Sequence, residues 1–163
     1  MKSSILSVFL FLYLPLQSQN IEPLKIYSFK EVEQLQKKNQ KPLLVFIYTD
    51  WCKICYGMKK TTFKNSNIIQ LLNKKYYLLM LNGEEKKDIT FLDKTFAYKP
   101  TGNKTGVHEL AKALGSINGK MSYPTSILLN SRFQIELQID SFINSKKMND
   151  LLSDYLSEIE NKK

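Results

Sequence analysis

Two continuous runs of apolar residues, LLVFIY at residues 43–48 and YYLLML at residues 76–81, limit the folds open to this chain. A strand that is apolar at every position is buried on both faces, so helices must cover the sheet from both sides. Between the runs, a helical pattern begins at two cysteines, pauses at NSN (residues 65–67) and resumes with Ile68, Leu71 and Leu72. The segment therefore predicts parallel strands joined by a crossover helix. A chain of 163 residues, 43% of them hydrophobic, can supply the core.

The remaining pattern extends this unit to three layers. SFKE at residues 28–31 is a capping box and predicts a helix over residues 29–38. A short helix is predicted at residues 107–114, and residues 126–130 and 132–140 read as two strands joined by a polar turn. A closing helix carries Met148, Leu151, Leu152, Tyr155, Leu156 and Ile159 on one face. The order predicts an α/β fold, a three-layer α/β/α sandwich with a central mixed sheet. Residues 84–106 are polar and are expected to be a partly ordered insertion.

The first 18 residues have the order of a secretory signal peptide. Lys2 precedes an apolar run at residues 5–14, which is followed by Pro15 and by Leu16 and Ser18. This order predicts cleavage after Ser18 or Gln19 and a mature domain of residues 19–163. The alternative is an uncleaved anchor, but the run is much shorter than the roughly 20 helical residues that span a bilayer.

We expect the mature protein to begin near Gln19 and to reach the periplasm or an equivalent exported space, because signal peptidase removes segments of this composition. N-terminal sequencing of the exported protein checks this prediction. An exported protein that still begins with Met1 would contradict it.

The formal net charge is +9, from 24 lysine and arginine residues against 15 aspartate and glutamate residues. The lysines are spread along the whole chain, and Arg132 is the one arginine. Nucleic-acid-binding domains gather basic and aromatic residues on one face. The spread charge instead indicates a solvated basic surface, so we expect no nucleic acid among the partners. We also expect a monomer.

The only cysteines, Cys52 and Cys55, directly follow the only tryptophan, Trp51. As a structural disulfide the pair would close too small a loop to restrict the unfolded chain much. As part of a metal site it would have only His108 as a further ligand, with no fourth in view. A redox dithiol that needs no metal and no cofactor is the favoured interpretation.

W-C-x-x-C between a buried strand and a helix, with SYPT at residues 122–125 before a later strand, resembles the thioredoxin superfamily over about residues 24–160. The resemblance implies a thioredoxin-like fold and a redox disulfide between Cys52 and Cys55. It also implies a cis peptide bond between Tyr123 and Pro124, beside the dithiol. Trp51, Tyr123 and Pro124 are then expected to contact the substrate.

Position in the predicted helix assigns the two thiols different roles. Cys52 would lie at the exposed helix start, where the helix dipole and Lys53 favour the thiolate and should lower its pKa below the free value of about 8.5. Cys55 would lie one turn further in, nearer the core. We therefore expect Cys52 to attack a substrate disulfide and Cys55 to resolve the mixed disulfide.

More closely, YTDWCKIC with TTF downstream is similar to the C-terminal thioredoxin-like domain of the periplasmic reductant conductor DsbD and to small exported thioredoxin-like proteins. This similarity implies a reductant of exported protein disulfides, which receives electrons from a membrane or soluble redox partner. Two departures concern proton transfer, because Phe46 and Lys59 stand where that domain has acids. Asp50 remains as a base or as a helix cap.

Alternatives remain at three places. The protein is either an oxidoreductase or a thioredoxin-fold binding or chaperone module, and an oxidoreductase could be dedicated to cytochrome c maturation. The expected insertion, with Phe91, Phe96, Tyr98 and Pro100, either covers the dithiol and selects substrates or decorates the fold. His108 is expected to be a surface or capping residue.

Overall fold

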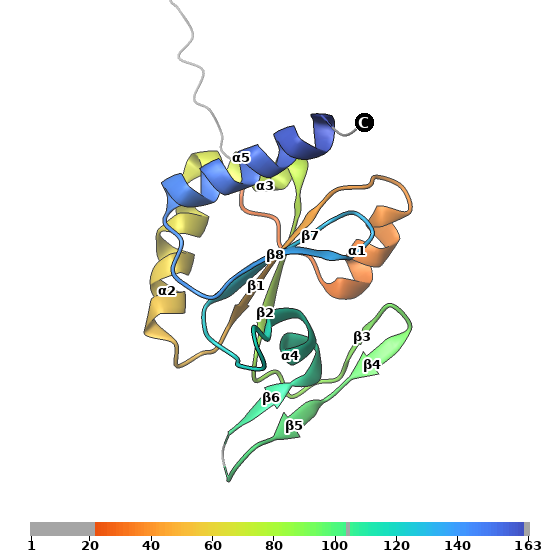
Figure 1. Cartoon of the computed structure of the whole chain (residues 1–163), viewed down its shortest axis with the longest axis vertical. Coiled ribbons are helices and arrows are strands. Elements are labelled where there is room, and N and C mark those ends of the chain that lie inside the picture. The colour runs from red at the N-terminus through yellow and green to blue at the C-terminus, as the bar shows by residue number, and fades with distance from the viewer. Residues whose placement is uncertain (1–21, 104, 162–163) are drawn as a thin grey trace, which may run out of the picture.

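Four strands form the central sheet in the order β2–β1–β7–β8, in a computed structural model that describes residues 22–103 and 105–161 (Figure 1). Strand β1 (Leu43–Tyr48) pairs in parallel with β2 (Tyr77–Asn82) and antiparallel with β7 (Thr125–Leu129). Strand β8 (Ile135–Ile139) pairs antiparallel with β7. The sheet is mixed, as the sequence predicts.

The side chains of β1 point alternately into two separate cores. Leu43, Val45 and Ile47 join one hydrophobic cluster, whereas Leu44 and Phe46 join the other. All five are at most 1% exposed. Burying one such side chain stabilises the fold by about 1.5–3 kcal/mol, so β1 stabilises both layers. It lies inside the sheet, between β2 and β7.

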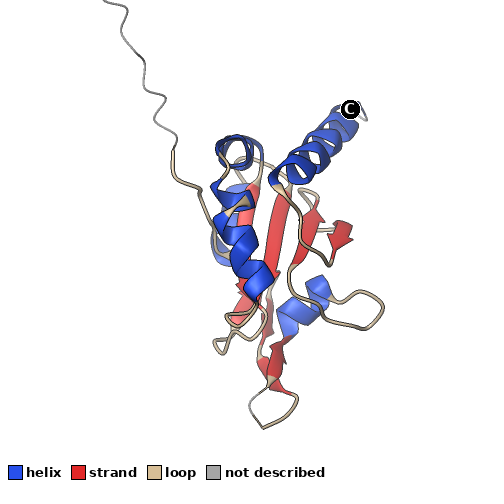
Figure 2. Ribbon diagram, turned by 90° about the vertical axis from the view of Figure 1, so that its left-hand side faces the viewer, coloured by secondary structure: helices blue, strands red, loops and turns tan. Residues whose placement is uncertain are grey.

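Five α-helices cover the two faces of the sheet within the described residues (Figures 1 and 2). The first core packs against α1 (Phe29–Gln36) and α4 (Glu109–Gly115). The second core packs against α2 (Lys53–Lys60), α3 (Ser66–Lys75) and α5 (Ser145–Asn161), with a short 3₁₀ helix, η1 (Thr62–Lys64), between α2 and α3. The predicted three-layer α/β/α architecture is therefore confirmed.

Two buried hydroxyl groups connect the second helical layer. The Tyr76 hydroxyl donates to the carbonyl of Leu152 over 2.6 Å, and the Thr62 hydroxyl donates to the carbonyl of Ile143 over 2.6 Å. Tyr76 and Thr62 are fully buried. Burial raises the pKa of the Tyr76 phenol far above its usual range, so it remains a neutral donor.

The capping box at the start of α1 is confirmed. The Ser28 hydroxyl accepts from the Glu31 amide, and the Glu31 carboxylate accepts from the Ser28 amide. The helix ends at Gln36, two residues before the predicted boundary. The side-chain amide of Gln36 donates to the Lys41 carbonyl over 2.6 Å and accepts from the Lys41 amide over 2.9 Å. These contacts turn the chain from α1 into β1.

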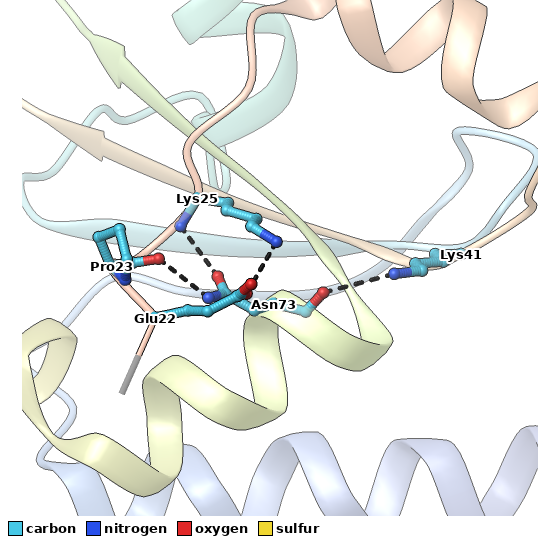
Figure 3. A network of polar contacts seen from close by, with 5 residues as sticks. All are labelled: Glu22, Pro23, Lys25, Lys41 and Asn73. Carbon is cyan, nitrogen blue, oxygen red and sulfur yellow. Dashed lines mark hydrogen bonds and ion pairs between the residues drawn. The ribbon is translucent and has the colours of Figure 1, made fainter. Parts of the chain in front are cut away.

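Asn73 on α3 ties the first described residues to the body of the protein (Figure 3). Its side chain accepts from the Lys25 amide over 2.9 Å and donates to the Pro23 carbonyl over 3.0 Å. The Tyr27 amide then donates to the Leu78 carbonyl over 2.8 Å, so this segment covers part of the β2 edge. The predicted signal peptide lies outside the described residues. No helix within residues 22–103 and 105–161 is both long and apolar enough to cross a bilayer.

Residues 84–106 are more regular than expected, because they contain most of two β-hairpins. Strands β3 (Ile89–Phe91) and β4 (Lys94–Phe96) form the first hairpin, and β5 (Tyr98–Pro100) and β6 (Gly106–His108) form the second (Figure 1). The predicted helix at 107–114 consequently begins two residues later, at Glu109. The first turn has positive φ at both Leu92 and Asp93. Hairpin turns of this kind favour Asn-Gly, so Leu-Asp did not signal one.

Candidate functional site

The two cysteines lie at the start of α2, directly beyond the carboxyl end of β1. Cys52 is the N-cap residue, and its Sγ accepts a hydrogen bond from the Cys55 amide over 3.0 Å. The two side chains form a disulfide, with the Cα atoms 5.2 Å apart. Cys52 is 6% exposed and Cys55 is fully buried. Cys52 is therefore nearly fully buried although it lies at the start of the helix, and it is the more exposed of the two cysteines.

The N-cap position places Cys52 Sγ at the positive end of the α2 dipole. A sulfur that already accepts a backbone N–H there has a donor in place to stabilise a thiolate when the disulfide is reduced. Cys55 lies one turn inside the helix among apolar side chains, including Met58 and Phe63. The geometry gives the two sulfurs unequal surroundings, as the sequence predicts.

Trp51 is the largest exposed side chain beside the disulfide, at 64% exposure. Its indole Nε1 donates to a Glu84 carboxylate oxygen over 3.1 Å. Its ring lies edge-on to the Tyr123 ring, with centroids 5.8 Å apart. Trp51 is thus an exposed side chain that makes two contacts with the rest of the site.

Tyr123 and Pro124 lie in the loop that enters β7. The peptide bond between them is cis, and the Thr125 hydroxyl donates to the Ser122 carbonyl over 2.7 Å. Pro124 is buried, and Tyr123 packs against the hydrophobic cluster that contains both cysteines. Burial, and secondarily the charge of Glu84, raises the pKa of the Tyr123 phenol. The loop thus meets Trp51 and the dithiol cluster, which brings together the residues that the sequence singled out.

Aromatic rings fill the space where the resemblance predicts an acid. Phe46 is fully buried, with its ring centroid 4.9 Å from that of Phe63 and 6.1 Å from that of Tyr48. Lys59, at the second acid position, places its Nζ 3.2 Å from the centroid of the Tyr48 ring. Desolvation lowers the pKa of Lys59, while the nearby Asp50 carboxylate acts in the opposite direction. Neither of these positions offers a carboxylate to the dithiol.

Asp50 does not cap α2, because Cys52 occupies the N-cap position. The Asp50 carboxylate instead accepts from the side-chain amide of Asn82 over 3.1 Å. The cap interpretation is therefore wrong, and Asp50 belongs to a polar contact between the ends of β1 and β2.

His108 is a capping residue but not a surface residue. It is fully buried, and its Nδ1 accepts from the Leu110 amide over 3.2 Å at the start of α4. An accepting Nδ1 belongs to the neutral ring with its proton on Nε2. Within the described chain, Nε2 has no hydrogen-bond partner, and no three His, Cys, Asp or Glu side chains gather closely enough to hold a metal ion.

The segment from Asn82 to Glu84 is the part of the site that sequence reasoning missed. The Gly83 amide donates to the Tyr48 carbonyl over 2.7 Å, and its carbonyl accepts from the His108 amide over 2.8 Å. A Cβ atom at Gly83 would lie 2.5 Å from the Tyr123 ring. A glycine directly after a buried strand signals such a close approach, so the Asn-Gly pair at the end of YYLLMLNG was an available signal.

A central β1, a disulfide at the N-terminus of the next helix and a cis-proline loop whose Tyr123 packs on the cysteine cluster are the features of a thioredoxin-type fold. The family model described as "Thioredoxin-like domain" matches residues 29–156, most of the chain. The protein therefore belongs to the thioredoxin-like domain family.

Solved structures agree with this fold at low sequence identity. A thioredoxin from Thermus thermophilus aligns with a TM-score of 0.58 and 14% identity, covering 83% of this chain and 88% of that one. A disulphide isomerase from Xylella fastidiosa Temecula1 aligns with a TM-score of 0.52 and 16% identity, covering 89% of this chain and 98% of that one. The DsbH oxidoreductase aligns with a TM-score of 0.52 and 13% identity, covering 86% of this chain and 84% of that one. No curated protein sequence matches the chain significantly.

Replacing Gly83 by alanine should destabilise the protein. The added Cβ must displace the Tyr123 ring, which packs on Trp51 and on both cores, so we expect the free energy of unfolding to fall by about 1–3 kcal/mol. Gly57→Ala is the matched control, because its Cβ meets nothing within 4 Å in the interior of α2 and should stabilise by about 0.5–1 kcal/mol. Urea unfolding of both oxidised variants measures the difference, and equal effects would contradict this account of Gly83.

Proposed function

We propose that this protein is an exported thiol–disulfide oxidoreductase that reduces disulfides of other proteins. The observation that carries the proposal is the unequal setting of the two sulfurs. Cys52 Sγ lies at the N-cap of α2 and accepts the Cys55 amide, whereas Cys55 is fully buried one turn inside the helix. The nucleophile is therefore Cys52 and the resolving thiol is Cys55.

The reaction proceeds through two thiol–disulfide exchanges. In the reduced protein, the Cys52 thiolate attacks one sulfur of a substrate disulfide, forming a mixed disulfide and releasing the other substrate sulfur as a thiolate. Cys55 then loses its proton and attacks Cys52 Sγ, which releases the second substrate thiolate and forms the Cys52–Cys55 disulfide. Two electrons pass to the substrate, and its two thiolates take up protons. A dithiol redox partner, membrane-bound or soluble, must return the two electrons.

Exposed apolar side chains around the disulfide suit a polypeptide substrate. Trp51, Ile54 and Tyr56 are 64%, 57% and 62% exposed. Exposed apolar groups of this kind mark surfaces that bind other proteins. In the proposal, the substrate chain docks on Trp51 and lies along the Tyr123–Pro124 loop, with the Tyr123 backbone pairing with an extended segment.

The proposed direction and location rest on the sequence. The similarity of YTDWCKIC to the DsbD domain supports a reductant, and the order of residues 1–18 supports export. This site differs from that domain at two positions, where Phe46 and Lys59 replace its acidic residues. The Cys55 proton therefore leaves without a carboxylate at either position, and Asp50, on the Asn82 contact, is the nearest acid in sequence to the dithiol.

Single cysteine variants test the roles of the two sulfurs. Cys55→Ser should accumulate mixed disulfides with substrate proteins, because the intermediate forms at Cys52 and is not resolved. Cys52→Ser should accumulate few, because the remaining thiol is fully buried. Non-reducing electrophoresis of thiol-trapped protein measures both. Equal trapping would reverse the role assignment, and trapping by neither would favour a binding or chaperone module.

The reduction potential of the Cys52–Cys55 couple tests the direction of electron flow. We expect a value near that of thioredoxin, about −270 mV, after equilibration with glutathione buffers. A value near about −120 mV, typical of strong oxidants, would refute the reductant assignment but leave the exchange chemistry intact.

A further inference from the structure

Trp51 is exposed, and its indole makes two contacts with the rest of the protein. The indole Nε1 donates to Glu84, and the ring rests edge-on against Tyr123. The residue that follows Trp51 is Cys52, and the residue that follows Tyr123 is Pro124. The Glu84 contact therefore orients an exposed aromatic ring that joins the residue before Cys52 to the residue before Pro124.

Glu84 is itself placed by the turn that follows β2. Its amide donates to the Asn82 side-chain oxygen over 3.0 Å, and the Asn82 side-chain nitrogen donates to Asp50 over 3.1 Å. Gly83, between them, is hydrogen-bonded on both sides, to Tyr48 and to His108. The backbone at Glu84 is thus anchored independently of its carboxylate. A change of the Glu84 side chain should leave this turn in place.

We propose that Glu84 is a positioning residue that holds the Trp51 indole as a docking surface for the polypeptide around a substrate disulfide. This inference rests on the proposed function and assigns a role to the first residue of the expected insertion, 84–106. A ring held in the bound orientation loses less freedom on binding, so a protein substrate docks more tightly. A small disulfide has no polypeptide that could dock on the indole, so its binding gains little affinity from the fixed ring. Glu84 therefore selects protein disulfides over small ones.

The test compares two disulfides, insulin and hydroxyethyl disulfide, as substrates of the reduced full-length protein. In Glu84→Ala we expect kcat/KM for insulin to fall about five- to tenfold, mainly through KM. The rate with hydroxyethyl disulfide and the reduction potential should stay within about twofold and about 10 mV of wild type. Since Trp51 is the one tryptophan, its fluorescence anisotropy should fall in the same variant.

Two further variants separate the hydrogen bond from other effects of Glu84. Glu84→Gln keeps an oxygen acceptor and should retain insulin activity within about twofold of wild type. Trp51→Phe removes the indole N–H, so adding Glu84→Ala to it should cause no further loss. Asp88→Ala, which removes an exposed acid four residues later, is the matched control for charge and should leave insulin activity unchanged.

The outcomes distinguish this inference from the proposed function. If the wild-type protein exchanges with neither disulfide, the proposed function fails and the docking role fails with it. If the wild type exchanges with both but Glu84→Ala slows both equally or neither, only the role of Glu84 is refuted. An equal loss in the Trp51→Phe background would likewise show that Glu84 does not act through the indole.

Discussion

The burial of β1 on both faces is the constraint on which the rest of the structure depends. Its alternating side chains enter both hydrophobic cores, so helices must pack against each face of the sheet. The strand also pairs on both sides, with β2 and with β7, so it lies inside the sheet. The chain therefore leaves the centre of the sheet at Tyr48, and the disulfide-bearing start of α2 follows within a few residues.

The site is assembled from three chain segments that meet at this end of the sheet. Trp51 and Cys52 follow β1, Gly83 and Glu84 follow β2, and Tyr123 precedes β7. Parallel β1 and β2 end at the same side, and antiparallel β7 begins there. Gly83 lets the Tyr123 ring approach the end of β2 closely. The dithiol is thus framed by contacts that are far apart in sequence but adjacent in the sheet.

The surroundings of the disulfide are apolar and aromatic on the inner side. Phe46 and Phe63 pack in the same cluster as the cysteines, and Lys59 lies over the Tyr48 ring. An apolar environment disfavours a charged Cys55 thiolate, whereas the N-cap environment favours a charged Cys52 thiolate. In the proposed reaction, this difference would keep the roles proposed for Cys52 and Cys55 separate without a carboxylate at position 46 or 59.

The sequence alone determined the features that depend on residues close together in the chain. The apolar run of β1, the Ser28–Glu31 capping box and the C-x-x-C pair before a helix are each recognisable within a few positions, because strand burial, capping and helix starts are local. Only the tertiary structure decided the rest. The Trp51–Glu84 hydrogen bond joins residues 33 positions apart, and the burial of His108 depends on β6. Such contacts follow from how the sheet brings strand ends together, which local sequence patterns do not encode.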